Sequence, residues 1–403
     1  MELFWLEHKK LWRKKIVKIC VLLCFVYCVI FGSILLFQWF GFGSSDDYTS
    51  AFGNNFDGYT VIKDSQEYAL SFGGELTDET LQKIVSDYQQ MEADGMGEEL
   101  EKTDWQIVNS WLGTLYPELR DTSNYKTMIS YVDPDKLTGF YERRQQVLDE
   151  FLEISGQVGA EKEFLHQIER KVEKPFHYEW VEGWSTLLGS MVADLGVVMA
   201  LFLGIVLSSL FAGEWRDNTS TLVLTTRNGW GKIALAKILT GFAFTVELFA
   251  LLAVSNVISQ LFFMGTAGWD MPIQNIKLIA VAPMNMLQAE IYEYAFVLLG
   301  AIGFAGIVMF ISAAVKNNVL TLLLSLAVVY GPMMIAEYLP YEMQKALDLI
   351  PLVGSSTDIF RTNTFRIFGK LIWSPYLLIT IPVLIGILCM PFAIRSWSRR
   401  MKA

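Results

Sequence analysis

The chain has 403 residues, of which 53% are hydrophobic, and its formal net charge is −10. Its hydrophobic residues are concentrated in long uncharged runs, which excludes a wholly soluble arrangement of two or three domains and indicates membrane helices. The charge is divided unevenly, because residues 41–185 hold 29 acidic and 12 basic side chains (net −17) and the remainder carries +7. The basic residues flank the apolar runs and form no aromatic-laced patch, which argues against nucleic acid as a partner.

Residues 1–18 are predicted to form an amphipathic helix at the membrane interface. Trp5 and Trp12 suit a boundary between water and lipid, and six basic residues accompany them. The uncharged run that follows exceeds the roughly 20 residues needed to span a bilayer and is too long for a cleaved signal sequence. Residues 19–44 are therefore the first predicted membrane helix, and the basic residues before it place the N-terminus in the cytoplasm.

Residues 45–182 are predicted to form an acidic external domain that is mostly helical. Thr77 opens an amphipathic pattern that continues to Tyr88, and Asp133-Pro134 breaks the chain before another helix. Helices are expected at about 77–88, 105–115, 137–154 and 160–173, and strands in the region from 46 to 75. The domain contains no cysteine, so no disulfide stabilises it.

Residues 183–403 are predicted to hold membrane helices 2–6. These are expected at 185–210, 238–268, 294–315, 319–336 and 373–394, with a cytoplasmic loop at 212–236 and an external re-entrant segment at 338–372. Gly300, Gly303 and Gly306 form a strip of small residues that suits helix packing. Four basic residues after the last helix keep the C-terminus in the cytoplasm. The expected fold is an α-helical polytopic cell-membrane protein with six membrane helices.

The loop after the second membrane helix carries a specific order of residues. It reads Phe-x-x-Glu-x4-Thr-x-x-Leu-Val-Leu-Thr from Phe211 to Thr225, followed by Lys-Ile-x3-Lys from Lys232 to Lys237. One interpretation is a plain cytoplasmic connector, with Lys232 and Lys237 reaching the lipid headgroups. On the other interpretation, Glu214 lies just below the membrane and accepts hydrogen bonds from a partner or from a basic neighbour such as Arg216.

This pattern resembles the coupling loop of ABC transporter permeases of the type 2 exporter family, which have the type V exporter fold. Those proteins read F-x-x-E-x-x-x-G-T, then leucines, T-x-P-x-S-R, K-I and a final lysine. This chain keeps the spacing but has Asn218, Arg227 and Trp230 where glycine, proline and arginine are usual. The resemblance implies a short helix that docks on an ATPase. Its contact residues would be Glu214, Thr219, Leu222, Leu224, Arg227 and Lys232.

The resemblance also covers the six-helix order, the N-terminal interfacial helix and the segment before the last helix, which in the family forms short re-entrant helices. The external domain is similar to that of a Gram-positive subgroup, through the strings at 132–137 and 174–178. A half-transporter is implied: the partners would be an ABC ATPase subunit, a second permease copy and membrane lipids. ATP and Mg would be bound by the ATPase, and this chain would bind no cofactor. Peptide antibiotics, lipids, drugs and sodium are all substrates of relatives.

The sequence contains no phosphate loop of the form GxxxxGK[ST], no HExxH and no GxSxG, so enzymatic activity is not expected of this chain. No metal site is predicted, because the three histidines are dispersed and Cys20, Cys24 and Cys28 suit packing on one helix face. Asp194 and Glu247 interrupt predicted membrane helices near their midpoints. They are interpreted either as part of a translocation path or as protonated packing residues.

A second class of function remains open from the sequence. The chain would then be a membrane-anchored sensor or immunity protein whose external domain binds an extracellular ligand without transport. The coupling-loop spacing favours the exporter, because a sensor has no need of a coupling helix.

Overall fold

Helices dominate the computed structural model, which describes residues 2–37, 58–71, 73–96, 105–121, 123, 125–188, 192–219, 231–353 and 362–399. Five helical segments within these ranges are long and apolar enough to cross a membrane: Leu195–Arg216, Lys232–Met264, Met286–Ala314, Asn318–Tyr338 and Ser374–Ser398. Helix α2, Lys15–Phe37, covers the first predicted membrane helix as far as Phe37, and residues 38–44 lie outside the described ranges. The sixth crossing stays a prediction.

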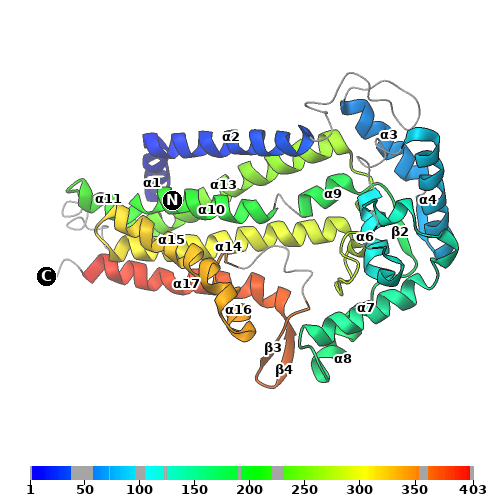
Figure 1. Cartoon of the computed structure of the whole chain (residues 1–403). Coiled ribbons are helices and arrows are strands. Elements are labelled where there is room, and N and C mark those ends of the chain that lie inside the picture. The colour runs from blue at the N-terminus through cyan, green and yellow to red at the C-terminus, as the bar shows by residue number, and fades with distance from the viewer. Residues whose placement is uncertain are drawn as a thin grey trace.

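The long helices form an elongated bundle around α14 (Figure 1). α14 packs against α10, α13, α15 and α17. The bounds of the bundle helices are α10 Val192–Leu207, α11 Ser209–Arg216, α13 Lys232–Met264, α14 Met286–Ala314, α15 Asn318–Ile335 and α17 Ser374–Arg399. Their apolar faces bury one continuous hydrophobic core, which provides the main packing of this part of the chain.

Glycine allows α14 and α17 to approach each other closely. A Cβ atom added at Gly306 would lie 2.6 Å from the Cα atom of Gly386, and one added at Gly386 would lie 2.7 Å from the Cα atom of Gly303. The predicted packing role of Gly303 and Gly306 is confirmed, because no side chain larger than hydrogen fits between these backbones.

Helix α1, Glu2–Arg13, runs across the bundle axis at the end opposite the folded domain (Figure 1). The chain bends at Lys14, and α2 begins at Lys15. The interfacial helix is therefore shorter than the predicted 1–18. α1 packs on α13 and α2 and buries Leu11. We call this end of the bundle the α1 end.

The folded domain at the other end, here called the insert domain, lies between α2 and α10. Strands β1, Gly74–Leu76, and β2, Phe176–Tyr178, pair antiparallel and join its beginning to its end. Its helices are α3 Gly58–Ser71, α4 Asp78–Met91, η1 Glu92–Met96, α6 Trp105–Leu115, η2 Pro117–Leu119, η3 Met128–Ser130, η4 Pro134–Lys136, α7 Phe140–Ile154, α8 Ala160–Glu169 and α9 Glu182–Thr186. The predicted helices near 77–88, 105–115, 137–154 and 160–173 are confirmed. The cap at Thr77 is also present, since its hydroxyl accepts a hydrogen bond from the Thr80 amide.

The loop between α13 and α14 is part of the core of the insert domain. This loop, residues 265–285, contains η6, Ile273–Asn275, and buries Met271, Ile273 and Val281 among side chains of the domain. The Trp111 indole donates to the Asn275 carbonyl at 2.8 Å, and the Trp180 indole donates to the Met264 carbonyl at 2.9 Å. The insert domain is thus fixed directly to the ends of two bundle helices.

Arg144 is the most deeply buried cation of the insert domain core, with no exposed side-chain area. Its Nε donates to the Leu278 carbonyl at 2.7 Å, and its Nη2 donates to the Ala280 carbonyl at 3.1 Å. Glu169 neutralises the guanidinium at 2.6 Å and also pairs with Lys174 at 2.9 Å. The two hydrogen bonds from the Arg144 guanidinium to the loop carbonyls therefore strengthen the attachment of α7 to the α13–α14 loop.

The segment 338–372 differs from the expectation of short re-entrant helices. It begins where η7, Ala336–Tyr338, ends and contains α16, Tyr341–Leu347, but the chain then forms an antiparallel hairpin of β3, Thr364–Ile367, and β4, Lys370–Trp373. Phe368 and Gly369 both have positive φ, 49° and 80°, as a two-residue hairpin turn requires. Arg366 of the hairpin pairs with Glu161 of α8 at 2.8 Å, so the hairpin contacts the insert domain.

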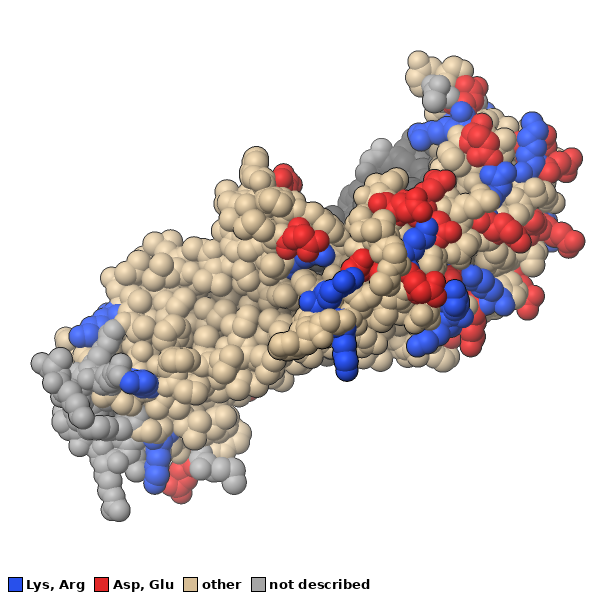
Figure 2. Space-filling model, turned by 90° about the horizontal axis from the view of Figure 1, so that it is seen from below, with Lys and Arg blue, Asp and Glu red and all other residues tan. Residues whose placement is uncertain are grey.

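Charged side chains gather at the two ends of the molecule. Figure 2 shows a broad band of uncharged surface across the bundle and many acidic and basic residues on the insert domain. This distribution suits a bundle whose middle faces lipid, because charged groups in hydrocarbon are costly.

Candidate functional site

The candidate site lies at the α1 end, where α11 stops. The Asn218 amide donates to the Trp215 carbonyl at 3.2 Å, and the Thr219 amide donates to the Glu214 carbonyl at 3.0 Å. Asn218 has a φ of 57°. These two hydrogen bonds, together with the left-handed backbone of Asn218, form a Schellman motif, which ends a helix and satisfies its last carbonyls. The same turn brings the Thr219 hydroxyl onto the Glu214 carboxylate, to which it donates.

Glu214 is the centre of a buried ion cluster that joins three helices. Lys10 of α1 contacts its Oε1 at 2.5 Å, and Lys237 of α13 contacts the same oxygen at 2.8 Å. Lys237 also contacts Glu7 of α1 at 2.8 Å. Lys14, at the bend after α1, donates to the Ser209 hydroxyl of α11 at 3.0 Å. We call Glu7, Lys10, Lys14, Glu214 and Lys237 the ion cluster.

Burial makes the balance of charge in the ion cluster important. Only 2% of the Lys237 side chain and 5% of the Glu214 side chain are exposed. Burial opposes the charged form of Lys10, but its hydrogen bond to Glu214 and that carboxylate's negative charge raise the pKa of Lys10 overall. Burial, together with the nearby charges of Lys237 and Lys10, lowers the pKa of Lys14 to about 8. Lys14 therefore loses its charge at a lower pH than an ordinary lysine does.

The arrangement holds three helices together. It presents carboxylates and ammonium groups that neutralise one another across α1, α11 and α13. Removing one partner of a buried pair costs about 3–5 kcal/mol, since the other charge is left uncompensated. The ion cluster therefore resists separation of α11 from α1 and α13.

The predicted partners of this region need correction. Arg216 does not bind Glu214; it pairs with its neighbour Asp217 at 2.8 Å. Lys237 does not extend to the lipid headgroups, because its ammonium is buried against Glu7 and Glu214. Lys232 is exposed in the first turn of α13. Three further predicted coupling residues, Leu222, Leu224 and Arg227, lie outside the described residues.

Asp194 and Glu247, the two residues assigned to a translocation path, occupy different surroundings. Asp194 lies in the first turn of α10, the end nearest the insert domain, and its side chain is outside the described set. Glu247 is partly exposed and contacts α1: its carboxylate accepts from the Trp12 indole at 3.0 Å and lies 3.1 Å from Nε2 of His8. Glu247 therefore helps to hold α1 on α13.

Sequence reasoning missed two carboxyl groups that are buried inside the bundle. Glu290 is 4% exposed, and Glu293 has no exposed area. Both were placed before the predicted helix 294–315, whereas α14 begins at Met286. The missed signal is a capping box, in which Asn285 accepts from the Gln288 amide and Gln288 accepts from the Asn285 amide. Reading Asn-x-x-Gln as a helix start would have placed both glutamates in α14.

Within the described part of the chain, no group of three or more His, Cys, Asp or Glu side chains could hold a metal ion. Cys20, Cys24 and Cys28 are buried on one face of α2, where they pack in the bundle core. No protein-family model, no curated protein and no solved structure matches this chain. The argument for function consequently rests on the residues and their geometry.

Proposed function

We propose that this chain is the membrane permease subunit of an ATP-binding cassette exporter. In this proposal the α1 end faces the cytoplasm and the insert domain faces outward. The basic residues of α1 and of the segment after α17 support this orientation by the positive-inside rule. A separate ABC ATPase binds ATP and Mg, and a second permease copy completes the transporter in the cell membrane.

The observation that carries the proposal is the end of α11. Glu214 and Thr219 hold the motif positions of the coupling loop, and they contact each other within the Schellman motif. Asn218 stands where the resembling permeases have glycine, and its backbone is left-handed. Asparagine is among the residues that most readily adopt this conformation, so the departure from glycine preserves the turn.

The proposed mechanism follows from the contacts of the ion cluster. ATP-driven closure of the two ATPases pushes on the loop 212–236, and α11 receives the displacement. The ion cluster makes α1 and α13 move with α11. α13 has 33 residues and so reaches about 50 Å, from Lys232 at the α1 end to Met264 at the insert domain. The displacement then opens an outward path for a peptide, lipid or drug.

A charge-removal series tests the proposal. Glu214→Gln alone leaves Lys237 with one carboxylate partner, and we expect a loss of thermal stability. In the double variant Glu214→Gln/Lys237→Met the two most buried charges are gone, and the charges that lose a partner, on Lys10 and Glu7, are more exposed, so stability should recover in part. We expect the recovered double variant to have lower ATP hydrolysis by the copurified ATPase than wild type. Lys9→Gln, which removes an exposed charge of α1 outside the ion cluster, is the matched control.

The series distinguishes coupling from simple stabilisation. Full hydrolysis and full ATPase binding in a stable double variant would show that the cluster only holds the fold together. Reduced hydrolysis in the Lys9→Gln control to the same extent would also count against the proposal, because an exposed lysine outside the ion cluster would then matter as much.

A further inference from the structure

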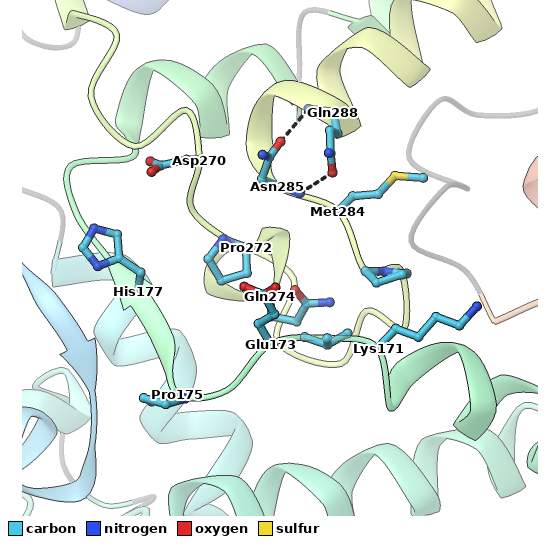
Figure 3. A pocket seen from close by; sticks show the side chains of 12 residues that line it. Lys171, Glu173, Pro175, His177, Asp270, Pro272, Gln274, Met284, Asn285 and Gln288 are labelled. Carbon is cyan, nitrogen blue, oxygen red and sulfur yellow. Dashed lines mark hydrogen bonds between the residues drawn. The ribbon is translucent and has the colours of Figure 1, made fainter.

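A polar cavity lies between the insert domain and the α13–α14 loop. Its volume is about 330 Å³, which is within the range of small-molecule sites. One wall comes from the segment around β2, with Lys171, Glu173 and His177, and the other from the loop, with Asp270 and Gln274 (Figure 3). The cavity thus spans the junction at which the insert domain is fixed to α13 and α14.

Gln274 gives the cavity an acceptor that is not used by the protein. The side chain is fully buried, and its Nε2 donates to the carbonyls of Ala280 at 3.0 Å and Ala282 at 2.9 Å. Those two bonds fix the orientation of the Gln274 side-chain amide, because its nitrogen faces the two carbonyls. The other end of the side chain is therefore its carbonyl oxygen, Oε1. Among the described residues Oε1 of Gln274 has no hydrogen-bond partner. A buried acceptor without a donor is costly, and a ligand that donates would remove this cost.

The remaining polar groups of the cavity favour a positively charged donor. Asn285 and Gln288 use their side-chain oxygens in the capping box, as the dashed lines in Figure 3 show. Glu173 and Asp270 contribute exposed carboxylates. The Lys171 ammonium extends away from both carboxylates (Figure 3).

His177 does not change this balance of charge. Its ring nitrogen Nε2 lies 3.0 Å from the Glu179 carboxylate, which also accepts from the Gly268 amide at 3.1 Å. The histidine is therefore held by a carboxylate next to the cavity. A ligand in the cavity would face the carboxylates of Glu173 and Asp270, which are negative, and the side-chain carbonyl of Gln274, which is neutral.

We propose that this cavity binds a small organic cation through an ammonium group. The ammonium would donate to Oε1 of Gln274, and the carboxylates of Glu173 and Asp270, on either side of Pro272, would attract it by their negative charge (Figure 3). Because the cavity joins the insert domain to the α13–α14 loop, such a ligand would bind both at once. The site is separate from the ion cluster at the α1 end and does not depend on the proposed exporter function.

Titration of the full chain in lipid nanodiscs, without any ATPase, tests this site. The probe is cadaverine, and the matched control ligand is 1,5-pentanediol, which has the same chain length and no charge. We expect saturable binding of cadaverine only. Glu173→Gln/Asp270→Asn should weaken it at least about tenfold, because two negative charges are removed from the cavity wall. Lys171→Gln should strengthen binding, and Glu150→Gln, an exposed change elsewhere in the insert domain, should leave it unchanged.

Three results would overturn the proposal. These are an absence of saturable cadaverine binding, binding of pentanediol that is as tight as that of cadaverine, and a loss of binding in Glu150→Gln as large as in the double variant. Glu173 and Asp270 are both exposed, so their substitution should preserve the fold, and an unchanged melting temperature checks this. Since the assay contains no ATPase, failure here leaves the proposed function untouched.

Discussion

Lys237 and Arg144 are basic side chains buried at opposite ends of the protein, and each is neutralised by glutamate. Glu7 and Glu214 surround Lys237, whereas Glu169 and two loop carbonyls surround Arg144. Both clusters connect elements far apart in the sequence, since the Lys10–Glu214 pair spans 204 positions. Buried charge of this kind fixes which elements lie together, because each partner is costly to leave alone.

The acid sensitivity of the insert domain should depend on Glu169. Burial favours its neutral form, but hydrogen bonds from Lys174 and Arg144 outweigh burial and lower the pKa of Glu169. A lowered pKa stabilises the fold at pH values above the ordinary glutamate pKa, about 4.3, and this stability is lost as the pH falls through the lowered pKa. We therefore expect Glu169→Gln to reduce stability by about 3 kcal/mol at pH 7.

The difference between wild type and Glu169→Gln should shrink as the pH falls below about 4.3. Thermal unfolding of both proteins across this range measures it, with Glu150→Gln as a control for loss of an exposed carboxylate. A difference that stays constant with pH would contradict the assignment of Glu169 as the ionised partner of Arg144.

The sequence predicted which residues belong to the candidate site better than it predicted which side chains they contact. Glu214 and Thr219 were selected from motif spacing, and they contact each other. The neighbour Arg216 was chosen as a partner of Glu214 because it is close in sequence. The true partners, Lys10 and Lys237, come from other helices, and one sequence without a fold does not show such distant pairings.

At the scale of elements, α14 is the helix on which the bundle depends. It packs on α10, α11, α13, α15 and α17, and its glycines allow the close approach of α17. The strip of small residues was readable from the sequence, because spacing of three places Gly303 and Gly306 on one face. The sequence analysis did not predict the β3–β4 hairpin, although residues that favour strands flank Phe368-Gly369 on both sides. The prediction for this segment followed the short helices of the resembling proteins instead.

Substitution of one α14 glycine should separate α14 from α17. Gly306→Ala places a methyl group against the backbone of Gly386, and we expect a lower melting temperature and a loss of about 1–3 kcal/mol from overpacking. The matched control is Gly331→Ala in α15, where nothing lies within 4 Å of the added Cβ. There the change should be neutral or stabilising by up to about 1 kcal/mol, because alanine favours a helix more than glycine does. Equal melting temperatures for the two variants would contradict the close helix contact.

At the scale of the whole molecule, α13 connects the ion cluster to the insert domain. Lys237, near its start, binds α1 and α11, and Met264, at its end, accepts a hydrogen bond from Trp180. The long apolar runs predicted this bundle, because an apolar segment in a bilayer satisfies its backbone hydrogen bonds by forming a helix. It did not predict that the α13–α14 loop would enter the core of the insert domain, since burial of that loop depends on contacts with Trp111 and Arg144.

The central claim is that this chain transmits the work of a separate ATPase. The most direct test is affinity purification of the tagged full chain from the cells that encode it, followed by peptide identification and measurement of Mg-ATP hydrolysis. We predict copurification of a polypeptide with a phosphate loop and the ABC signature, together with ATP hydrolysis. Leu222→Asp/Leu224→Asp, at the two motif leucines, should abolish both while the chain still inserts in the membrane. A wild-type chain that purifies without a nucleotide-binding partner and without hydrolysis would contradict the account.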